Sequence, residues 1–260
     1  MKKPTQYSNT LLWWNILRSI AILNISLWFI CALSSSYSGH YTLHHAILSG
    51  IFTLVCAFRS FFPRIDLERY CLVDSFASSM VLGRSAATIA EISFATQIAL
   101  FLHDFGLYYA RPGLGTCAIV IVFLLCSAQI FCWLGITTRN HLWHGIEESL
   151  WALSFGIVGI ALYTTPFDGQ WIWIGQLGPL TCLGYVMFML WIDVPMYIQR
   201  WQQERHETTY LSFRNGFSDA LYTRIVTKEW RIWKEEVAWL TGYFSFAVWI
   251  SIFIFIYIQP

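Results

Sequence analysis

The sequence predicts an all-α, polytopic membrane protein with about seven transmembrane helices. Of its 260 residues, 57% are hydrophobic and only 12% are charged, whereas soluble domains carry about 25% charged residues. Aromatic residues make up 18% of the chain and include 14 Trp. A soluble fold of this size could not cover so much apolar surface with so few charges. The surrounding solvent is therefore mostly lipid.

Each predicted span supplies most of the roughly 20 apolar residues that cross a hydrocarbon layer of about 30 Å. The segment 45–58 is the shortest, and 73–102 is long enough to tilt or to extend beyond the membrane. We treat residues 1–260 as one integral membrane domain, in which 199–235 is a cytoplasmic segment at the interface. The predicted spans are 11–33, 45–58, 73–102, 114–136, 146–164, 172–198 and 236–258.

Lysine and arginine are distributed unevenly between the two sets of loops. One set contains Lys2, Lys3 and Arg139, a group of arginines after the second span, and the basic stretch 200–234. The other set contains Arg111. Because cytoplasmic loops are rich in Lys and Arg, we expect a cytoplasmic N-terminus, an odd number of spans and a C-terminus outside. The protein is thus expected to be a multi-pass protein of the plasma (inner) membrane.

The segment 199–235 mixes basic residues with Trp230 and Trp233. This composition is typical of a helix that lies at the membrane interface before the chain enters the bilayer. We expect it to anchor the protein there, although a docking role remains open.

Composition also bears on cofactors and partners. The seven cysteines are scattered singly and form no CxxC pair, so neither a disulfide framework nor a zinc module is indicated. Three outer histidines, His40, His44 and His45, offer donors for copper or zinc, but nothing fixes their geometry, and we assign no metal site. The net charge of +1 argues against a nucleic-acid partner. The sequence identifies no cofactor.

The third span carries two charged residues, Arg84 and Glu91, on one small, polar helical face with Thr88. Unpartnered, each would cost about 2.5–3.5 kcal/mol to insert. They lie about 10.5 Å apart along the axis, beyond an ordinary i,i+4 pair, so we expect each to find its partner on another helix. The pair either forms a functional site or fixes the packing of the helices.

The fifth span opens with RNHLWHGIEESLW, in which Asn140 is suited to cap the helix. An imidazole four residues before a carboxylate can hydrogen-bond to it, so His144 and Glu148 form a candidate acid/base pair. A structurally satisfied histidine and a metal ligand are the alternatives. On the helical wheel Glu147 points elsewhere. The residues that share one face are His141, His144, Glu148 and Trp151.

Two further carboxylates are expected at a similar depth. Asp74 lies near the predicted start of the third span, and Asp193 lies near the end of the sixth, where Pro195 favours a kink. Asp193 opposes the dipole of a helix C-terminus and therefore needs a partner, such as Arg200 or Arg84. If these spans are neighbours, the carboxylates line one cavity in the cytoplasmic leaflet together with Glu148.

These groups favour a membrane-embedded enzyme that acts on a lipid or another hydrophobic substrate, with membrane lipids and a hydrophobic small molecule as partners. Enzymatic activity remains open, because a small proton-coupled transporter or an assembly subunit would use the same charges differently. No span contains a lysine, which argues against a retinal Schiff base. The candidate catalytic residues are Glu148, His144, Glu91 and Asp193, and the candidate substrate-binding residues are Arg84, His141, Asp74 and Trp151.

Overall fold

The computed structural model describes residues 4–35, 40–204 and 210–257, and most of these residues are helical. Within these described residues, seven helices are long and apolar enough to cross a membrane, which agrees with the predicted all-α class and the predicted number of spans. These candidate spans are Ser8–Ser34, Thr42–Phe61, Met80–Tyr108, Pro112–Thr138, His141–Thr164, Gly169–Glu204 and Val237–Ile256.

Several helix boundaries differ from those predicted, and two of the differences change the description of a span. The second span is a full helix, α2 (His40–Phe61), and not a short one. The third helix, α3 (Met80–Tyr108), begins seven residues after the predicted start. The side chain of Ser75 accepts a hydrogen bond from the N–H of Ala77 and so caps a separate 3₁₀ turn, η1 (Phe76–Ser78). This local cap competes with continuation of the helix towards the N-terminus.

The contacts of the chain define two compact units, and each is described separately. Unit 1 comprises residues 1–97 and 220–259, and unit 2 comprises 98–219. The boundaries therefore fall within α3 and within α8 (Phe213–Tyr222).

Unit 1 contains α1 (Pro4–Ser34), α2, the first part of α3 and a helical segment at the C-terminal end of the chain. Polar side chains tie these helices together inside the apolar layer. The amide of Gln97 donates to the carbonyl of Ser251 and accepts from its hydroxyl, so it joins α3 to the C-terminal helix. The C-terminal segment consists of α9 (Trp230–Trp233), α10 (Val237–Gly242), a π-helical turn η4 (Tyr243–Ala247) and α11 (Val248–Tyr257).

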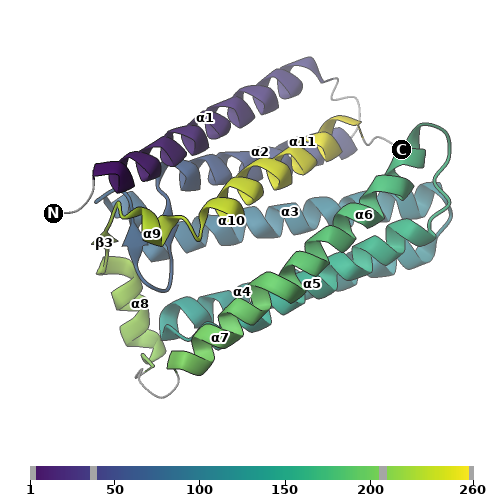
Figure 1. Ribbon diagram of the computed structural model, residues 1–260. Helices are drawn as coiled ribbons and strands as arrows, with labels where there is room; N and C mark the ends of the chain where they lie inside the picture. The colour runs from purple at the N-terminus through teal and green to yellow at the C-terminus, as the bar shows by residue number, and fades with distance from the viewer. Residues whose placement is uncertain (1–3, 36–39, 205–209, 258–260) are drawn as a thin grey trace. The chain divides into compact units, whose positions relative to one another are not determined.

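A small three-stranded sheet completes unit 1. β1 (Arg64–Ile65) pairs antiparallel with β2 (Tyr70–Cys71), and β2 pairs in parallel with β3 (Ile225–Val226). The antiparallel register sets Arg64 opposite Cys71, and the parallel register sets Cys71 opposite Val226. Two segments that lie far apart in the sequence therefore meet here, as Figure 1 shows near the label of β3.

The segment between the sixth and seventh spans is more varied than the predicted interfacial helix. It contains α8, β3 and α9. Trp233 is fully buried, its ring centroid lies 5.7 Å from that of Trp13, and its indole N–H donates to the carbonyl of Thr227. Trp233 is therefore a core residue and not an interfacial anchor. The prediction missed this because its partner, α1, is distant in the sequence.

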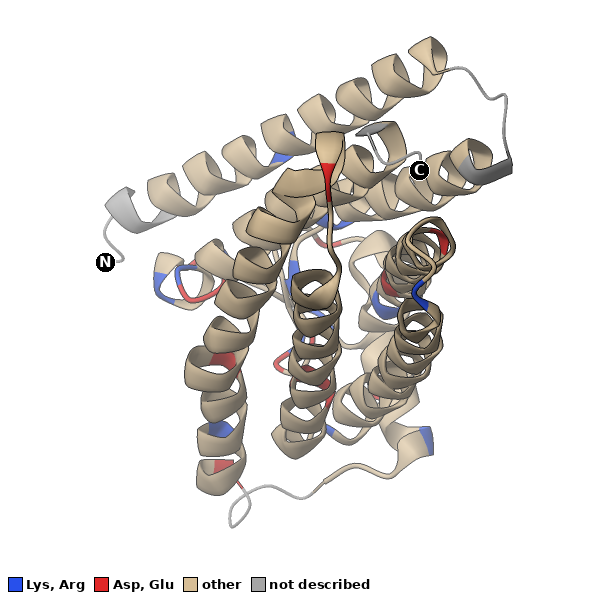
Figure 2. Ribbon diagram, turned by 90° about the vertical axis from the view of Figure 1, so that its right-hand side faces the viewer, with Lys and Arg blue, Asp and Glu red and all other residues tan. Residues whose placement is uncertain are grey.

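Unit 2 is built around α5 (His141–Thr164), which packs against α4 (Pro112–Thr138), α6 (Ile172–Phe188) and α7 (Val194–Glu204). Figure 1 shows these helices running side by side. A 3₁₀ turn, η2 (Gly169–Trp171), precedes α6. The ribbon in Figure 2 is tan over most of each long helix, so the charged residues inside the spans stand out.

A π-helical turn, η3 (Met189–Asp193), separates α6 from α7. Pro195 follows directly, and proline removes the donor of one helical hydrogen bond and clashes with the carbonyl four residues before it. A π turn accommodates both effects with one extra residue. The distortion predicted near Pro195 is present, and it places Asp193 in the wide turn.

Candidate functional site

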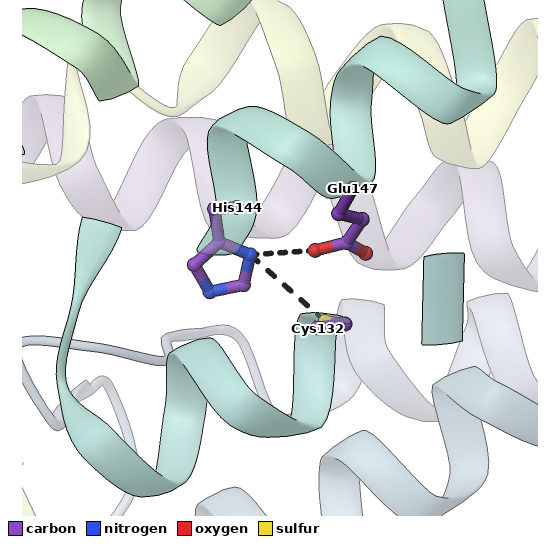
Figure 3. Close-up of side chains that lie close together, drawn as sticks. All are labelled: Cys132, His144 and Glu147. Atoms are coloured by element: carbon purple, nitrogen blue, oxygen red, sulfur yellow. Dashed lines mark hydrogen bonds and ion pairs between the residues drawn. The ribbon is translucent and has the colours of Figure 1, made fainter. Parts of the chain in front are cut away.

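A buried cluster of Cys132, His144 and Glu147 lies where α4 and the first turns of α5 face each other in unit 2. The distance between Nδ1 of His144 and Oε2 of Glu147 is 2.6 Å, and Nδ1 lies 3.9 Å from Sγ of Cys132. Figure 3 shows both partners directed at the same ring nitrogen. All three residues are buried.

The start of α5 sets the position of the imidazole. The predicted N-cap is confirmed, because the Asn140 side chain accepts a hydrogen bond from the N–H of Leu142. Starting the helix at His141 puts His144 on its first turn and Glu147 three residues later, where i,i+3 side chains are neighbours.

Two contacts from other helices hold the ring in place. The ring of Tyr197 on α7 stacks on that of His144, with centroids 5.3 Å apart and planes at 30°. On the other side the imidazole rests against Gly135 of α4, where a Cβ atom would lie 2.9 Å from Cδ2. Gly135 is therefore needed for the close approach of the ring to the α4 backbone.

The hydrogen bond to Glu147 determines which ring nitrogen is available. A carboxylate only accepts, so Nδ1 of a neutral His144 carries the proton and Nε2 carries the lone pair. Nε2 is buried and makes no hydrogen bond to any residue in the described ranges. A buried, unsatisfied nitrogen costs free energy, which makes Nε2 the atom with capacity for a further partner.

Asp193 adds a second carboxylate to the surroundings of the cluster. It is buried in η3, which packs against α5 near enough for Asp193 and Glu147 to interact. The expectation that Arg200 is the partner of Asp193 stays a prediction. Single π turns inside helices occur often at functional sites.

The predicted partner of His144 was wrong. Glu148 is also buried on α5, but the carboxylate that hydrogen-bonds to the imidazole is Glu147, which the helical wheel directed elsewhere. The wheel separates His144 and Glu147 by about 60°, and two flexible side chains close that gap.

Two other residues of the predicted face have different surroundings. Nδ1 of His141 lies 2.7 Å from Oε2 of Glu204 at the end of α7, so it joins α5 to α7. Trp151 is buried, and its ring lies 6.1 Å from that of Phe155 on the same helix. Neither contact connects these residues to Nε2 of His144.

In unit 1, Arg84 and Glu91 pair with each other. Nη2 of Arg84 lies 2.6 Å from Oε2 of Glu91, and both side chains are buried. The expectation that the two residues lie too far apart to pair was wrong, because the long arginine side chain extends along two turns of α3. Nε of Arg84 also donates to the hydroxyl of Thr88 at 3.4 Å.

Asp74 does not begin a helix. It lies in the segment before η1, its side chain is 76% exposed, and Oδ1 is 3.6 Å from Nε of Arg224. The predicted position of Asp74 at the start of a span was therefore wrong. Asp74 belongs to unit 1, whereas Glu148 and Asp193 belong to unit 2, and the common cavity stays a prediction.

Metal ligation is one chemistry that the cluster permits. One donor atom each from Cys132, His144 and Glu147 lie within 4.8 Å of one another. Ligands of a tetrahedral zinc ion are about 3.3 Å apart when bond lengths are near 2.0 Å. The 2.6 Å contact is instead the length of a charge-assisted hydrogen bond, and a metal would have to displace its proton.

Of the outer histidines, His44 is exposed and His45 is buried, and the side chain of His40 lies outside the described residues.

A groove of 480 Å³ opens between the other ends of α4 and α5. Its walls are apolar, with Leu114, Cys117 and Ile160 among them, and Arg111 lies at its edge. Such a surface suits an acyl chain. Ile160 lies about 24 Å along α5 from His144, at the standard helical rise.

The sequence-based interpretation missed four residues of the site, namely Cys132, Gly135, Glu147 and Tyr197. The sequence did contain a signal for Glu147, since residues three apart on a helix are neighbours, as residues four apart are. The other three act across helix–helix contacts, which the periodicity of one helix does not encode.

Comparisons with protein-family models, with curated proteins and with solved structures find no match for this chain. The fold and the site therefore rest on the residues and contacts described above.

Proposed function

We propose that the protein is a membrane-embedded enzyme that acts on a lipid or another hydrophobic substrate, with His144 as its acid/base group. The observation that carries the proposal is the 2.6 Å contact between His144 and Glu147 within a buried part of a membrane span. Intramembrane ionisable residues are expensive to insert and are functional by default.

The chemistry follows from the two ring nitrogens. Nε2 takes a proton from the substrate, and Glu147 stabilises the imidazolium that forms because it holds the proton on Nδ1. The low dielectric of the surroundings strengthens this interaction. Asp193, whose charge acts on the same groups, supplies a second carboxylate that stabilises positive charge or returns the proton.

The remaining candidate residues have supporting or separate roles. Glu148, Trp151 and His141 lie on α5 together with His144, and we assign His141 to holding α7 against α5 through Glu204. Arg84 and Glu91 pair with each other in unit 1, and we give them no step in this chemistry.

The same proposal places the site in the cytoplasmic leaflet of the plasma (inner) membrane. The distribution of basic residues supports a cytoplasmic N-terminus and a C-terminus outside, and Arg139 directly precedes α5. The substrate would enter from the membrane, with lipids as the main partners and no role for nucleic acid.

The test is conversion of membrane components by the purified protein, followed by mass spectrometry. We expect one class of hydrophobic molecule in a membrane extract to be converted. His144→Gln should slow this conversion by about 10²–10⁴-fold, the usual contribution of general acid/base catalysis. Glu147→Gln should slow it less, because it removes only the stabilisation of the imidazolium.

Glu148→Gln is the matched comparison, since it makes the same change one residue away without touching the hydrogen bond to His144. The ¹⁵N signals of the His144 ring should shift in Glu147→Gln and stay in place in Glu148→Gln. Full conversion by His144→Gln would remove the residue from its role, and the absence of any conversion by the native protein would favour a scaffold. Bound metal in equimolar amount would contradict the proton-transfer role of Nε2.

A further inference from the structure

α2 carries a buried polar stripe along its whole length in unit 1. At about 100° per residue its members fall within an arc of about 80°, and they extend about 27 Å along the helix axis, close to the thickness of the hydrocarbon layer. Each side chain is at most 4% exposed. The members of this α2 stripe are Thr42, His45, Ser49, Thr53, Cys56 and Ser60.

Small polar residues also occur at ordinary helix–helix contacts, so the hydrogen bonds of the stripe decide what it does. Elsewhere the helical serines and threonines mostly satisfy themselves by donating to the carbonyl four residues before, as Ser60, Ser93 and Thr96 do. The hydroxyls of Ser49 and Thr53 do not. They are buried and make no hydrogen bond to any residue in the described part of the chain.

Two unsatisfied hydroxyls one helical turn apart need another partner. Each buried hydroxyl without a hydrogen bond costs about 1–3 kcal/mol, and this cost is usually removed by ordered water. Buried waters bind where two to four polar groups are within reach. The spacing of about 6 Å along the axis between Ser49 and Thr53 allows one or two waters to bridge them.

The stripe leads to the ion pair of α3. The charges of Glu91 and Arg59 act on the thiol of Cys56, one turn beyond Thr53. The hydroxyl of Tyr243 in η4 is under the influence of Glu91, Cys56, Arg59 and Arg84. Phe52 stacks on Phe94 with ring centroids 4.7 Å apart, so α2 and α3 are in contact at this level.

We propose that the α2 stripe holds a file of water molecules and conducts protons between His45 and Glu91. In each hop one O–H or N–H bond forms on the acceptor while one breaks on the donor, and the net result is movement of one proton without oxidation or reduction. Glu91 accepts the proton by releasing Arg84, and it then passes the proton to the hydroxyl of Tyr243, which interacts with Glu91 and Arg84. Tyr243 is partly exposed, so its hydroxyl releases a proton in turn, and Glu91 pairs again with Arg84. This function is independent of the chemistry proposed for unit 2.

Proton flux into proteoliposomes tests the proposal, with a pH-sensitive dye inside the vesicles and a potassium diffusion potential as the driving force. Vesicles with the native protein should acidify faster than empty vesicles. Thr53→Val keeps the shape of the side chain and removes its hydroxyl, and it should slow the flux roughly tenfold, which corresponds to about 1.4 kcal/mol on the limiting hop. Thr96→Val is the matched control, because Thr96 bonds to its own helix.

Two results would overturn the proposal. One is a flux through the native protein no faster than through empty vesicles, and the other is an unchanged flux in Thr53→Val. If the variant does not fold, water-edited solid-state NMR on the native protein decides the matter. Rapid transfer of magnetisation from water to Ser49 and Thr53 supports the water file. If neither residue receives magnetisation from water, the proposal is refuted.

Discussion

The Arg84 side chain forms its ion pair through both its positive charge and its length. Its guanidinium reaches Glu91 across two turns of α3, so one helix carries both members of a buried ion pair. The pair brings no net charge into the apolar layer, which lowers the cost of inserting α3. Both side chains belong to unit 1, beside the α2 stripe.

Arg84→Gln alone should destabilise the protein by about 3–5 kcal/mol, because it leaves a buried carboxylate without its counter-charge. The double variant with Glu91→Gln should recover part of this loss, since no uncompensated charge remains. Thermal unfolding in detergent measures both. The control is Arg231→Gln in an exposed pair, which should change stability by less than about 1 kcal/mol. If the losses of stability in the two single variants simply add in the double variant, Arg84 and Glu91 do not stabilise each other.

At the scale of one element, α8 is positioned by a close approach to α4. The backbone carbonyl of Thr137 occupies the place of a side chain at Gly216, since a Cβ there would lie 1.5 Å from that oxygen. The contact is reinforced by the Arg139 guanidinium, which donates to both carboxylate oxygens of Asp219 at 3.0 Å. Only glycine fits at this contact without movement of the backbone.

Gly216→Ala should therefore displace α8 from α4, at a cost of about 1–3 kcal/mol for overpacking. Trypsin should then cleave faster after Arg214, two residues away and exposed. Gly184→Ala on α6 is the matched substitution, because nothing lies within 4 Å of its added Cβ. That variant should be neutral or more stable by up to about 1 kcal/mol. Equal cleavage rates in the two variants would show that α8 is not held by this contact.

For the whole molecule, the composition of the chain predicted the fold class and the spans better than local sequence patterns predicted the ends of individual helices. In lipid the backbone polar groups must hydrogen-bond within each span, and the bilayer thickness sets the length of the helix. The class and the seven candidate spans could therefore be predicted. The start of α3 could not, because the cap at Ser75 is a local competition that periodicity does not show. In the site, His144 could be identified from its place in a span. Tyr197 could not, because it reaches the imidazole from a helix more than 50 residues later in the chain.

The orientation of the chain remains a prediction at this scale. Reporter fusions that are active on only one side of the membrane should place residue 1 in the cytoplasm and residue 260 outside. Fusions after Arg139 should report the cytoplasm, and those after Arg111 the outside, because basic loops are retained. The reverse pattern would move the site to the outer leaflet.

The discontinuity of unit 1 has a consequence for biogenesis. Its first part, which ends at Gln97, is synthesised before all of unit 2, and its second part begins only at residue 220. The amide of Gln97 is therefore inserted before the carbonyl of Ser251, to which it donates its hydrogen bond, has been synthesised. Asn24 is likewise inserted before Trp249, from which it accepts a hydrogen bond. Until the C-terminal helices of unit 1 have been inserted, these polar groups of the N-terminal helices lack the partners that satisfy them in the folded unit.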